Sequence, residues 1–288
     1  MDGESQDYGY EPFAQTAEYR EVNEAIVRNW VTKIREAGSR SVEQVLDLAT
    51  GVGTMIELLL DTLPARARPI EIVCVDMNAD ALEQAAKNLK RRVQNLRLVR
   101  ARLQDLSLED ECVDAAIWGN GVHYLSAEEQ SAACRNIRRT VRKKGWLFLN
   151  TAFYEEARPA STLAFYRSQI ARAVRDLRSR GISRDRNQPH PDSANFLPLT
   201  HYRNLLQQAG FEVEEMVQIE ARLHQAALQK ISGFSQYAAG ALHGYPPKAA
   251  AEAMRETVAP CLEEYGLRDE HGVPYIPRNW LSAIARVS

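Results

Sequence analysis

The sequence predicts an α/β fold: a doubly wound, mostly parallel sheet of seven strands, with helical insertions that form a cap. Between residues 41 and 152, short apolar runs alternate with helical patterns, which is the signature of βαβ units around a parallel sheet. Two longer, mainly helical stretches then interrupt the alternation, and a strand pattern returns after each of them. These observations predict one large domain, in which helical insertions are added to the α/β core.

The first part of the chain contains an N-terminal helix and five strand patterns. Residues 1–40 are expected to form a helical lid, with its helix around Glu18–Glu36, and 41–152 to form the ligand-binding core. The core strands are predicted at 45–48, 71–76, 96–100, 115–118 and 145–150. Apolar residues at helical spacing predict the intervening helices at 54–62, 79–91 and 127–141. Ser126 and Glu129 have the spacing of a capping box, which supports the start of the last of these helices.

The second part of the chain contains the insertions. Residues 153–197 predict a first helical cap insertion, and 198–218 continue the core with a helix that Thr200 caps and a strand at 211–217. A second insertion is expected at 219–275, helical from about 220 to 265, before a final core strand at 276–288. Right-handed crossovers place the carboxyl ends of parallel strands at one edge of the sheet, where such sheets bind ligands. We therefore expect the lid and the insertions to cover that edge.

Composition limits the classes of partner. The chain has 288 residues, of which 45% are hydrophobic, so it can form a substantial core. With 36 basic and 38 acidic residues, its net charge of −2 offers no general attraction to nucleic acid or to an anionic membrane, and we expect neither partner. The polar, acidic N-terminus and the absence of a bilayer-spanning apolar stretch predict a cytoplasmic protein. Its four scattered cysteines predict reduced thiols without structural zinc, and no metal is expected elsewhere.

The stretch "VLDLATGVGTM" contains a glycine turn between the first strand and the first helix. Gly51 and Gly53 lack side chains, so backbone N–H groups can approach a ligand closely. Dinucleotide-binding enzymes use G-x-G-x-x-G at this place, but the third glycine is missing here. Asp47 stands before the turn, where its carboxylate would repel a pyrophosphate and would suit a ligand with an amino group and a sulfonium. A nicotinamide-dependent oxidoreductase, whose cofactor contains a pyrophosphate, is therefore less well supported than a protein that binds a ligand with an amino group and a sulfonium.

At this turn the chain resembles the class I S-adenosylmethionine-dependent methyltransferases, whose first motif is roughly [DE]-x-G-x-G-x-G. The motif runs here from Asp47 to Gly53, with Ala49 in place of the first glycine, a replacement that is incompatible only if this position needs a positive φ. Further motifs follow the second, third and fourth strands in the expected order. The resemblance implies a Rossmann-like fold, S-adenosylmethionine as cofactor and S-adenosylhomocysteine as product. It implies cofactor-binding roles for Asp47, Ala49, Gly51, Gly53, Asp76, Met77, Gln104, Asp105, Leu106, Trp118 and Asn120.

Some of these residues have a specific implied role. Asp76 would accept hydrogen bonds from both ribose hydroxyls, Met77 would border the adenine, and Asp105 would accept from the adenine amino group. In the alternative interpretation, Asp47 and Asp76 only end strands and cap the following helices, and Asp105 caps a turn.

The acceptor side is predicted less directly. His123 follows the fourth strand, where an imidazole could act as general base or could orient the loop through one hydrogen bond. Displacement at a sulfonium chiefly requires alignment, so a base is not obligatory. The N-terminal aromatic residues could form a lid over the methyl group or an arm packed on the core. Candidate substrate-binding residues are Tyr10, Tyr19, His123, Tyr124, Arg172 and Arg175.

These observations predict a methyltransferase that acts on a small molecule, at an oxygen, nitrogen or carbon atom. A large cap indicates an enclosed acceptor, and "WGNG" after the fourth strand departs from the [NDS]-P-P-[YFW] signature of enzymes that methylate amino groups of DNA or RNA. Arg172 and Arg175 would favour an anionic acceptor, such as a carboxylate or a prenyl diphosphate, if their helix faces the pocket; a solvated helix surface is the default interpretation. A non-catalytic S-adenosylmethionine-binding protein remains the third hypothesis.

Overall fold

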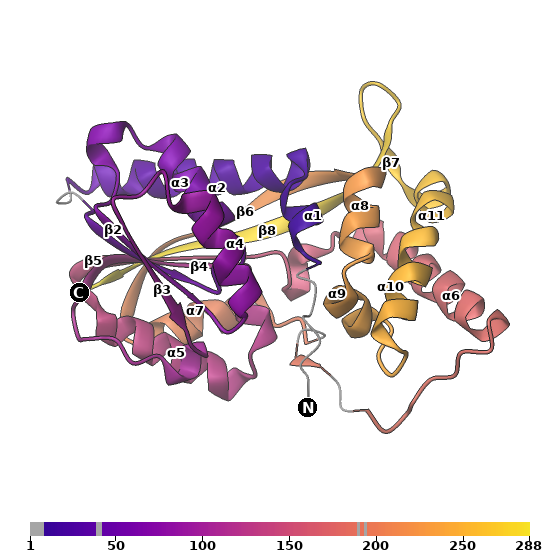
Figure 1. The fold of residues 1–288 in the computed structure, drawn as a ribbon. Helices are drawn as coiled ribbons and strands as arrows, with labels where there is room; N and C mark the ends of the chain where they lie inside the picture. Colours follow the sequence, from indigo (N-terminus) through magenta and orange to yellow (C-terminus); the bar gives the residue numbers. More distant parts are fainter. Residues whose placement is uncertain (1–8, 39–41, 189–190, 193–194) are drawn as a thin grey trace.

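A mixed sheet of eight strands lies at the centre of the molecule (Figure 1). The computed structural model describes residues 9–38, 42–188, 191–192 and 195–288, so residues 1–8 and 39–40 of the expected lid lie outside the described ranges. The strand order is β3-β2-β1-β4-β5-β8-β6, with the short β7 paired to β8. The strands are β1 (Gln44–Leu48), β2 (Glu71–Asp76), β3 (Asn95–Arg100), β4 (Val113–Gly119), β5 (Val141–Thr151), β6 (Phe211–His224), β7 (Leu267–Arg268) and β8 (Pro274–Val287).

Strands β1 to β5 are parallel, and β8 is antiparallel to both of its long neighbours, β5 and β6. The predicted fold class is confirmed, and among the described residues the one additional strand is the two-residue β7.

Helices cover both faces of the sheet. One face carries α2 (Ala17–Glu36), α3 (Thr54–Thr62) and α4 (Ala79–Leu89), and the other carries α5 (Ala127–Thr140) and α7 (Leu199–Gln208) (Figure 1). The side chains of β5 alternate between the two cores, as the pleat requires. Trp146 and Phe148 belong to the core beneath α2 and α3, whereas Leu147 and Leu149 belong to the core beneath α5 and α7.

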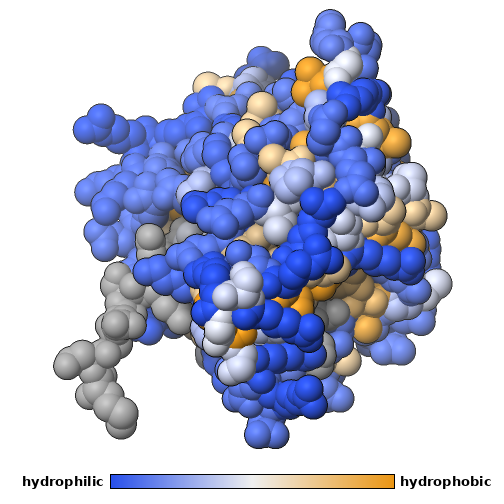
Figure 2. Space-filling view, turned by 90° about the vertical axis from the view of Figure 1, so that its right-hand side faces the viewer, coloured by the Kyte–Doolittle hydropathy of each residue, from blue (hydrophilic) through white to orange (hydrophobic). Residues whose placement is uncertain are grey.

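The remaining helices form the cap beyond the carboxyl edge of the parallel strands (Figure 1). Side chains of α6, α9 and α10 enclose a small apolar core of their own, with Ala173, Leu177, Ala238, Ala250 and Met254 among its members. The face of the molecule that presents this cap is largely hydrophilic, and its apolar residues form small separate groups (Figure 2). The cap helices are α6 (Leu163–Ser179), α8 (Gln225–Ser232), α9 (Ser235–Ala241), α10 (Pro247–Glu256) and α11 (Val258–Tyr265).

Short helical turns connect several of these elements. A four-residue helix, α1 (Glu11–Ala14), precedes α2. The 3₁₀ turns are η1 (Ala65–Ala67), η2 (Leu103–Asp105), η3 (Val122–Tyr124), η4 (Glu155–Ala157) and η5 (Ala160–Thr162). Among the described helices, none combines the length and the apolar character needed to cross a bilayer.

Local signals predicted some element ends and missed others. The capping box is confirmed, because the Ser126 hydroxyl accepts from the Glu129 N–H at 3.2 Å and the Glu129 carboxylate accepts from the Ser126 N–H at 3.0 Å. The prediction that Thr200 caps a helix is wrong, since α7 already begins at Leu199. The helical interpretation of residues 220–224 is also wrong. β6 continues to His224, because the ladder to β8 extends to the pair His224 and Tyr275.

Helix α2 is fixed to the sheet by polar and aromatic contacts. The Trp30 indole N–H donates to the Ser282 hydroxyl at 2.9 Å, and its ring stacks on Phe148 with centroids 5.1 Å apart. Lys33 forms an ion pair of 2.9 Å with Glu215 of β6. These contacts hold the C-terminal half of α2 on the sheet.

Candidate functional site

A cavity of about 650 Å³ lies at the carboxyl edge of the parallel strands. Its walls come from the loops that follow β1, β2, β3 and β4, from the lid around α1 and α2, and from α9. The edge that the strand order predicted for a ligand is therefore hollow. Ten of the predicted site residues line it: Asp47, Ala49, Gly51, Asp76, Met77, Gln104, Asn120, Tyr10, Tyr19 and Tyr124.

The turn after β1 needs three left-handed backbone conformations. Gly51 has φ 55°, Gly53 has φ 87° and Ala49 has φ 53°. An alanine at positive φ is strained by roughly 1–2 kcal/mol, so Ala49 is a real departure from the glycine of the motif. Gly53 is not part of the cavity wall. A side chain at Gly53 would begin 2.9 Å from Leu89 Cδ1, so this glycine permits close packing of α3 on α4.

Asp47 presents a buried carboxylate to the cavity. Its side chain is 1% exposed, and no group in the described ranges donates a hydrogen bond to its Oδ2. Burial raises the pKa of Asp47 to about 7, the Thr50 hydroxyl opposes this shift, and the nearby Asp76 adds to it. A buried carboxylate without a donor is costly unless a cation or donor approaches it. This feature fits the amino group of S-adenosylmethionine.

Asp76 joins the turn after β1 to the loop after β2. Its carboxylate accepts from the N–H groups of Gly51 and Asn78, both at 2.9 Å. Burial raises the pKa of Asp76, and these backbone donors counteract the shift. The remaining lone pairs of the carboxylate are available to a ligand in the cavity, which fits two ribose hydroxyls. Met77 beside it is 66% exposed, an unusual state for a large apolar side chain, and fits the edge of an adenine ring.

The residues after β3 are arranged differently from the expected pattern. Gln104 lines the cavity and donates to Glu129 Oε1 at 2.8 Å, while its own Oε1 is buried and has no partner in the described part of the chain. Arg102 also donates to Glu129, at 2.7 Å. Asp105 points away, since its side chain is 68% exposed and lies 4.0 Å from Arg102.

Two further predicted residues are outside the cavity wall. Leu106 and Trp118 are buried in the core beneath α5 and α7, on one face of the sheet. Sequence reasoning missed Glu129 and Arg102, both of which line the cavity. The signal for Glu129 was its capping-box position, which was interpreted only as a helix start.

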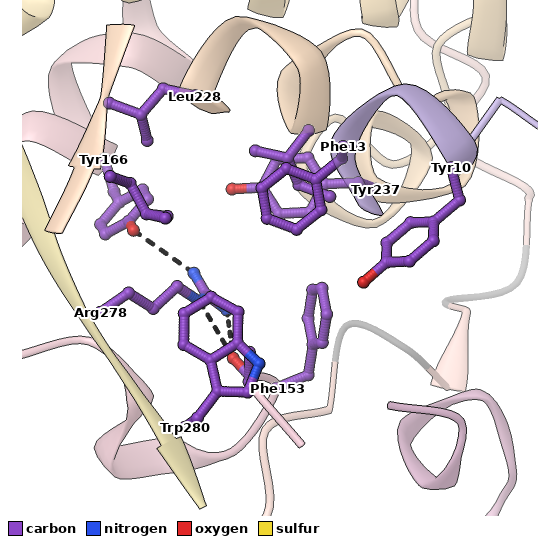
Figure 3. A pocket seen from close by; sticks show the side chains of 11 residues that line it. Tyr10, Phe13, Phe153, Tyr166, Leu228, Tyr237, Arg278 and Trp280 are labelled. Carbon is purple, nitrogen blue, oxygen red and sulfur yellow. Dashed lines mark hydrogen bonds between the residues drawn. The ribbon is translucent and has the colours of Figure 1, made fainter. Parts of the chain in front are cut away.

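A second cavity of about 300 Å³ adjoins the first, because Tyr124 and Gln236 line both. Its wall is mainly aromatic and aliphatic and includes Phe153, Ile170, Phe196 and Tyr237. A narrow space of about 10 Å³ lies beside it, where Tyr10 and Phe13 of the lid face Phe153, Tyr237 and Trp280 (Figure 3). The lid therefore borders both the large cavity and the aromatic cluster next to the second one.

His123 lines the second cavity and not the first. Its ring is 3% exposed, stacks on Phe153 at 4.0 Å between centroids and lies 4.1 Å from Tyr124. Burial lowers the pKa of His123 to about 3, and the positive charge of Arg278 contributes. Neither ring nitrogen has a hydrogen-bond partner among the described residues. The imidazole is thus neutral at physiological pH and has unused hydrogen-bonding capacity.

A buried polar network links the lid to the loop after β4. The Asn120 amide donates to the Tyr19 hydroxyl at 3.2 Å, and the Asn150 amide donates to Asn23 Oδ1 at 2.7 Å. Asn120 adopts φ 50°, a left-handed conformation that asparagine tolerates better than most residues. The network sets the position of Tyr19 relative to the end of β4.

The predicted arginines do not reach either cavity. Arg172 pairs with Glu264 of α11, and Arg175 is exposed on α6. Two other arginines lie near the second cavity instead. Arg158 lines it, and Arg278 of β8 is 4% exposed and donates to the Ala152 carbonyl at 3.0 Å and to the Tyr166 hydroxyl at 3.3 Å (Figure 3). Neither of these arginines belongs to α6, the helix that carries Arg172 and Arg175. Nowhere in the described part of the chain do three His, Cys, Asp or Glu side chains gather so as to hold a metal ion.

Comparisons with known proteins concern the domain and the fold. Residues 45–145 match the family model of a methyltransferase domain. A putative methyltransferase from Bacillus halodurans is similar with a TM-score of 0.53 at 15% identity, over 89% of this chain and 97% of that chain. A putative sarcosine dimethylglycine methyltransferase from Galdieria sulphuraria gives 0.52 at 14% identity, over 91% and 85%. The [4+2]-cyclase SpnF gives 0.52 at 16% identity, over 90% and 81%. At these identities the likeness shows a shared fold, and no curated protein sequence matched the chain.

Proposed function

The chain carries a class I methyltransferase domain that uses S-adenosylmethionine, and from this premise we propose that it methylates a small molecule held in the 300 Å³ cavity. The observation that carries the proposal is the junction of two cavities at Tyr124 and Gln236. The larger one has the polar groups that a cofactor needs, and the smaller one is mostly apolar. Small-molecule pockets measure about 300–1,000 Å³, so both volumes are appropriate.

Residues of the larger cavity would hold the cofactor by charge and hydrogen bonds. When bound, S-adenosylmethionine supplies a methyl group on a positively charged sulfur. We assign Asp47 to its amino group, because the carboxylate is buried and its Oδ2 has no donor among the described residues. Asp76 would accept from the ribose hydroxyls, and Gln104 with Glu129 would contact the adenine edge. Tyr10 and Tyr19 would exclude water from the sulfur side, since they join the lid to the cavity wall.

His123 would contact the acceptor. A pKa of about 3 makes its imidazole a weak base, so we favour a role in which the neutral ring orients the acceptor by a hydrogen bond. Its unpartnered ring nitrogens and its position on the second cavity support this assignment. Alignment of the acceptor atom with the methyl group would then supply much of the rate acceleration.

Two other functions explain the site less well. A nicotinamide dinucleotide would bring a pyrophosphate to the turn where Asp47 is buried, and the two negative groups would repel each other. A non-catalytic role leaves the second cavity without a purpose. The chain also resembles a cyclase, so a reaction other than methyl transfer is the second candidate function.

The first experiment is calorimetric titration with S-adenosylhomocysteine, run in parallel with NADH. We expect micromolar binding of the first and no binding of the second. The reverse result would show that the glycine turn holds a pyrophosphate and would refute the proposal. Incubation with S-adenosylmethionine carrying a labelled methyl group and a library of small molecules would then identify acceptors.

The location in the cytoplasm remains a prediction from the sequence.

A further inference from the structure

We propose that the acceptor carries one anionic group, a carboxylate or a phosphate monoester, and that Arg158 binds this group at the wall of the second cavity. The inference deepens the proposed function and rests on it, because it names the chemical class of the molecule that shares the site with the cofactor. It replaces Arg172 and Arg175, the residues that the sequence suggested for an anion, by an arginine that lies outside their helix.

Arg158 is held by aromatic rings and not by acids. Its guanidinium carbon lies 4.4 Å from the centroid of Tyr166 and 4.5 Å from that of Phe196. Such rings contact the face of a guanidinium, whereas its N–H donors lie in the plane and need acceptors at the edge. The Arg158 Nε is buried and has no hydrogen-bond partner in the described ranges. The donor edge of this side chain is therefore only partly used.

Within the described ranges, the charge of Arg158 has no counter-ion. Across the described residues, no carboxylate oxygen lies within 4.0 Å of Arg158 or of Arg278. Two arginines of the nearby cap do have such partners, since Arg172 pairs with Glu264 and Arg180 with Glu252. A sheltered cation without an anionic partner is unfavourable unless a ligand supplies the negative charge. The missing negative charge is the main evidence for an anionic ligand.

The other ionisable groups around Arg158 favour an anion as well. Burial lowers the pKa of the Arg158 guanidinium, and Arg278 contributes to the shift, so the two positive charges interact. Arg278 already donates to the Ala152 carbonyl and to the Tyr166 hydroxyl. It therefore contributes positive electrostatic potential near Arg158 and fewer free N–H donors. The remaining titratable neighbours are Tyr166, Tyr237 and the neutral His123.

The rest of the wall indicates the body of the ligand. Phe153, Ile170, Phe196 and Tyr237 offer apolar and aromatic surface around the guanidinium. A planar N–H fork suits both carboxylate and phosphate oxygens. The combination fits a small molecule with an aromatic or aliphatic body and one anionic end.

A matched set of three probes tests the inference on protein saturated with S-adenosylhomocysteine. They are 3-phenylpropanoate, 2-phenylethyl phosphate and the neutral 3-phenylpropanamide, and their affinities are measured by calorimetry and ligand-observed NMR. We expect at least one anion to bind about tenfold more tightly than the amide. The anion that binds better distinguishes a carboxylate from a phosphate.

Three variants make the test specific. Arg158→Gln should abolish the anion preference and leave the affinity for S-adenosylhomocysteine within about twofold. Arg158→Lys keeps the charge but loses the fork, and should retain part of the preference. Arg172→Gln removes an arginine that is paired with Glu264 and should change nothing.

The outcomes separate the two proposals. Failure of the unmodified protein to bind S-adenosylhomocysteine refutes the proposed function. If that molecule binds, the inference about Arg158 is overturned by any of three results: the amide binds as well as the anions, no anion binds at millimolar concentration, or the preference survives in Arg158→Gln.

Discussion

Ala49 occupies the space that the missing side chain of Gly121 leaves open. A Cβ atom added at Gly121 would lie 2.4 Å from the Cβ of Ala49, far inside any normal contact. The two residues belong to the loops after β1 and β4, and both line the larger cavity. Their fit fixes the separation of these loops, and it explains why the strained φ of 53° at Ala49 is tolerated.

A swap of one methyl group tests this contact. Gly121→Ala should destabilise the protein by roughly 1–3 kcal/mol, because the neighbouring Cβ cannot rotate away. Ala49→Gly alone should change stability by less than about 1 kcal/mol, since relief of strain opposes the added freedom of the unfolded chain. The double variant should recover most of the loss. Denaturant unfolding of all four proteins measures the coupling; additive effects would mean that the two residues do not contact.

Asp76 and Asp105 are predicted to differ in their effect on cofactor binding. Asp76→Asn should weaken binding of S-adenosylhomocysteine by about 10- to 100-fold, because its carboxylate accepts from Gly51 and would accept from the ribose. Asp105→Asn serves as the control, since its side chain is 68% exposed, and should change affinity by less than about twofold. Calorimetric titration with S-adenosylhomocysteine measures the affinity of both variants. A large loss in Asp105→Asn would restore the adenine contact that the sequence implied for it.

Cofactor affinity should rise with pH because of Asp47. Only the ionised carboxylate attracts the amino group of the ligand, and the pKa of Asp47 in the free protein is raised to about 7. Affinity for S-adenosylhomocysteine should increase about tenfold between pH 6 and pH 8, with release of a proton on binding. Titration in buffers of different ionisation enthalpy detects that proton. An equal pH dependence in Asp47→Asn would assign the effect to another group.

The same carboxylate should make the free protein less stable at higher pH. Its pKa in the folded state lies above the value of 3.8 for an exposed group, so the folded state holds the proton to higher pH than the unfolded state. This contribution to stability is complete below pH 4 and is lost as pH rises from 4 to 7, on the order of 4 kcal/mol. Thermal unfolding at pH 5 and pH 8 measures the change. Asp47→Asn should remove most of it, and S-adenosylhomocysteine should stabilise the unmodified protein more at pH 8.

His123 should leave no step in the pH–rate profile near pH 6.5. Burial lowers its pKa to about 3, so the ring keeps one protonation state across the accessible range. His123→Asn should lower turnover more than cofactor affinity, because the ring lines the acceptor cavity and not the cofactor cavity. Activity measured from pH 5 to pH 9 with an identified acceptor tests this. A step near neutral pH that disappears in His123→Asn would instead establish a general base.

Hydrophobic periodicity predicted the fold because each strand of the sheet contributes to two cores. Trp146, Leu147, Phe148 and Leu149 form a continuous apolar run in the sequence, which is typical of a strand buried on both faces, and the structure divides them between the two cores. Strand β6 was the exception. After Val217 its residues alternate between polar and apolar, but this short stretch was interpreted as the start of a helix, and its length depends on a partner, β8, that lies more than fifty residues away in sequence. Pairing over that distance leaves no local signal.

Part of the candidate site is brought together by the backbone alone. Asp47, Gly51 and Asp76 follow strands whose carboxyl ends meet at one edge, so order along the chain was enough to bring them together. The acceptor side depends on the packing of the cap, which the sequence does not specify. Arg158 lies outside α6, and its aromatic neighbours and its place in the wall of the second cavity distinguish it from the arginines on that helix.

The position of β8 has a consequence for the order of folding. This strand follows all the others in sequence, yet it lies between β5 and β6 and pairs with both. During synthesis, the edges of β5 and β6 therefore stay unpaired until Pro274–Val287 has left the ribosome. Exposed strand edges promote association with other chains. Release of the nascent chain before this segment emerges should favour aggregation, and a chaperone that shields the two edges should matter most in that interval.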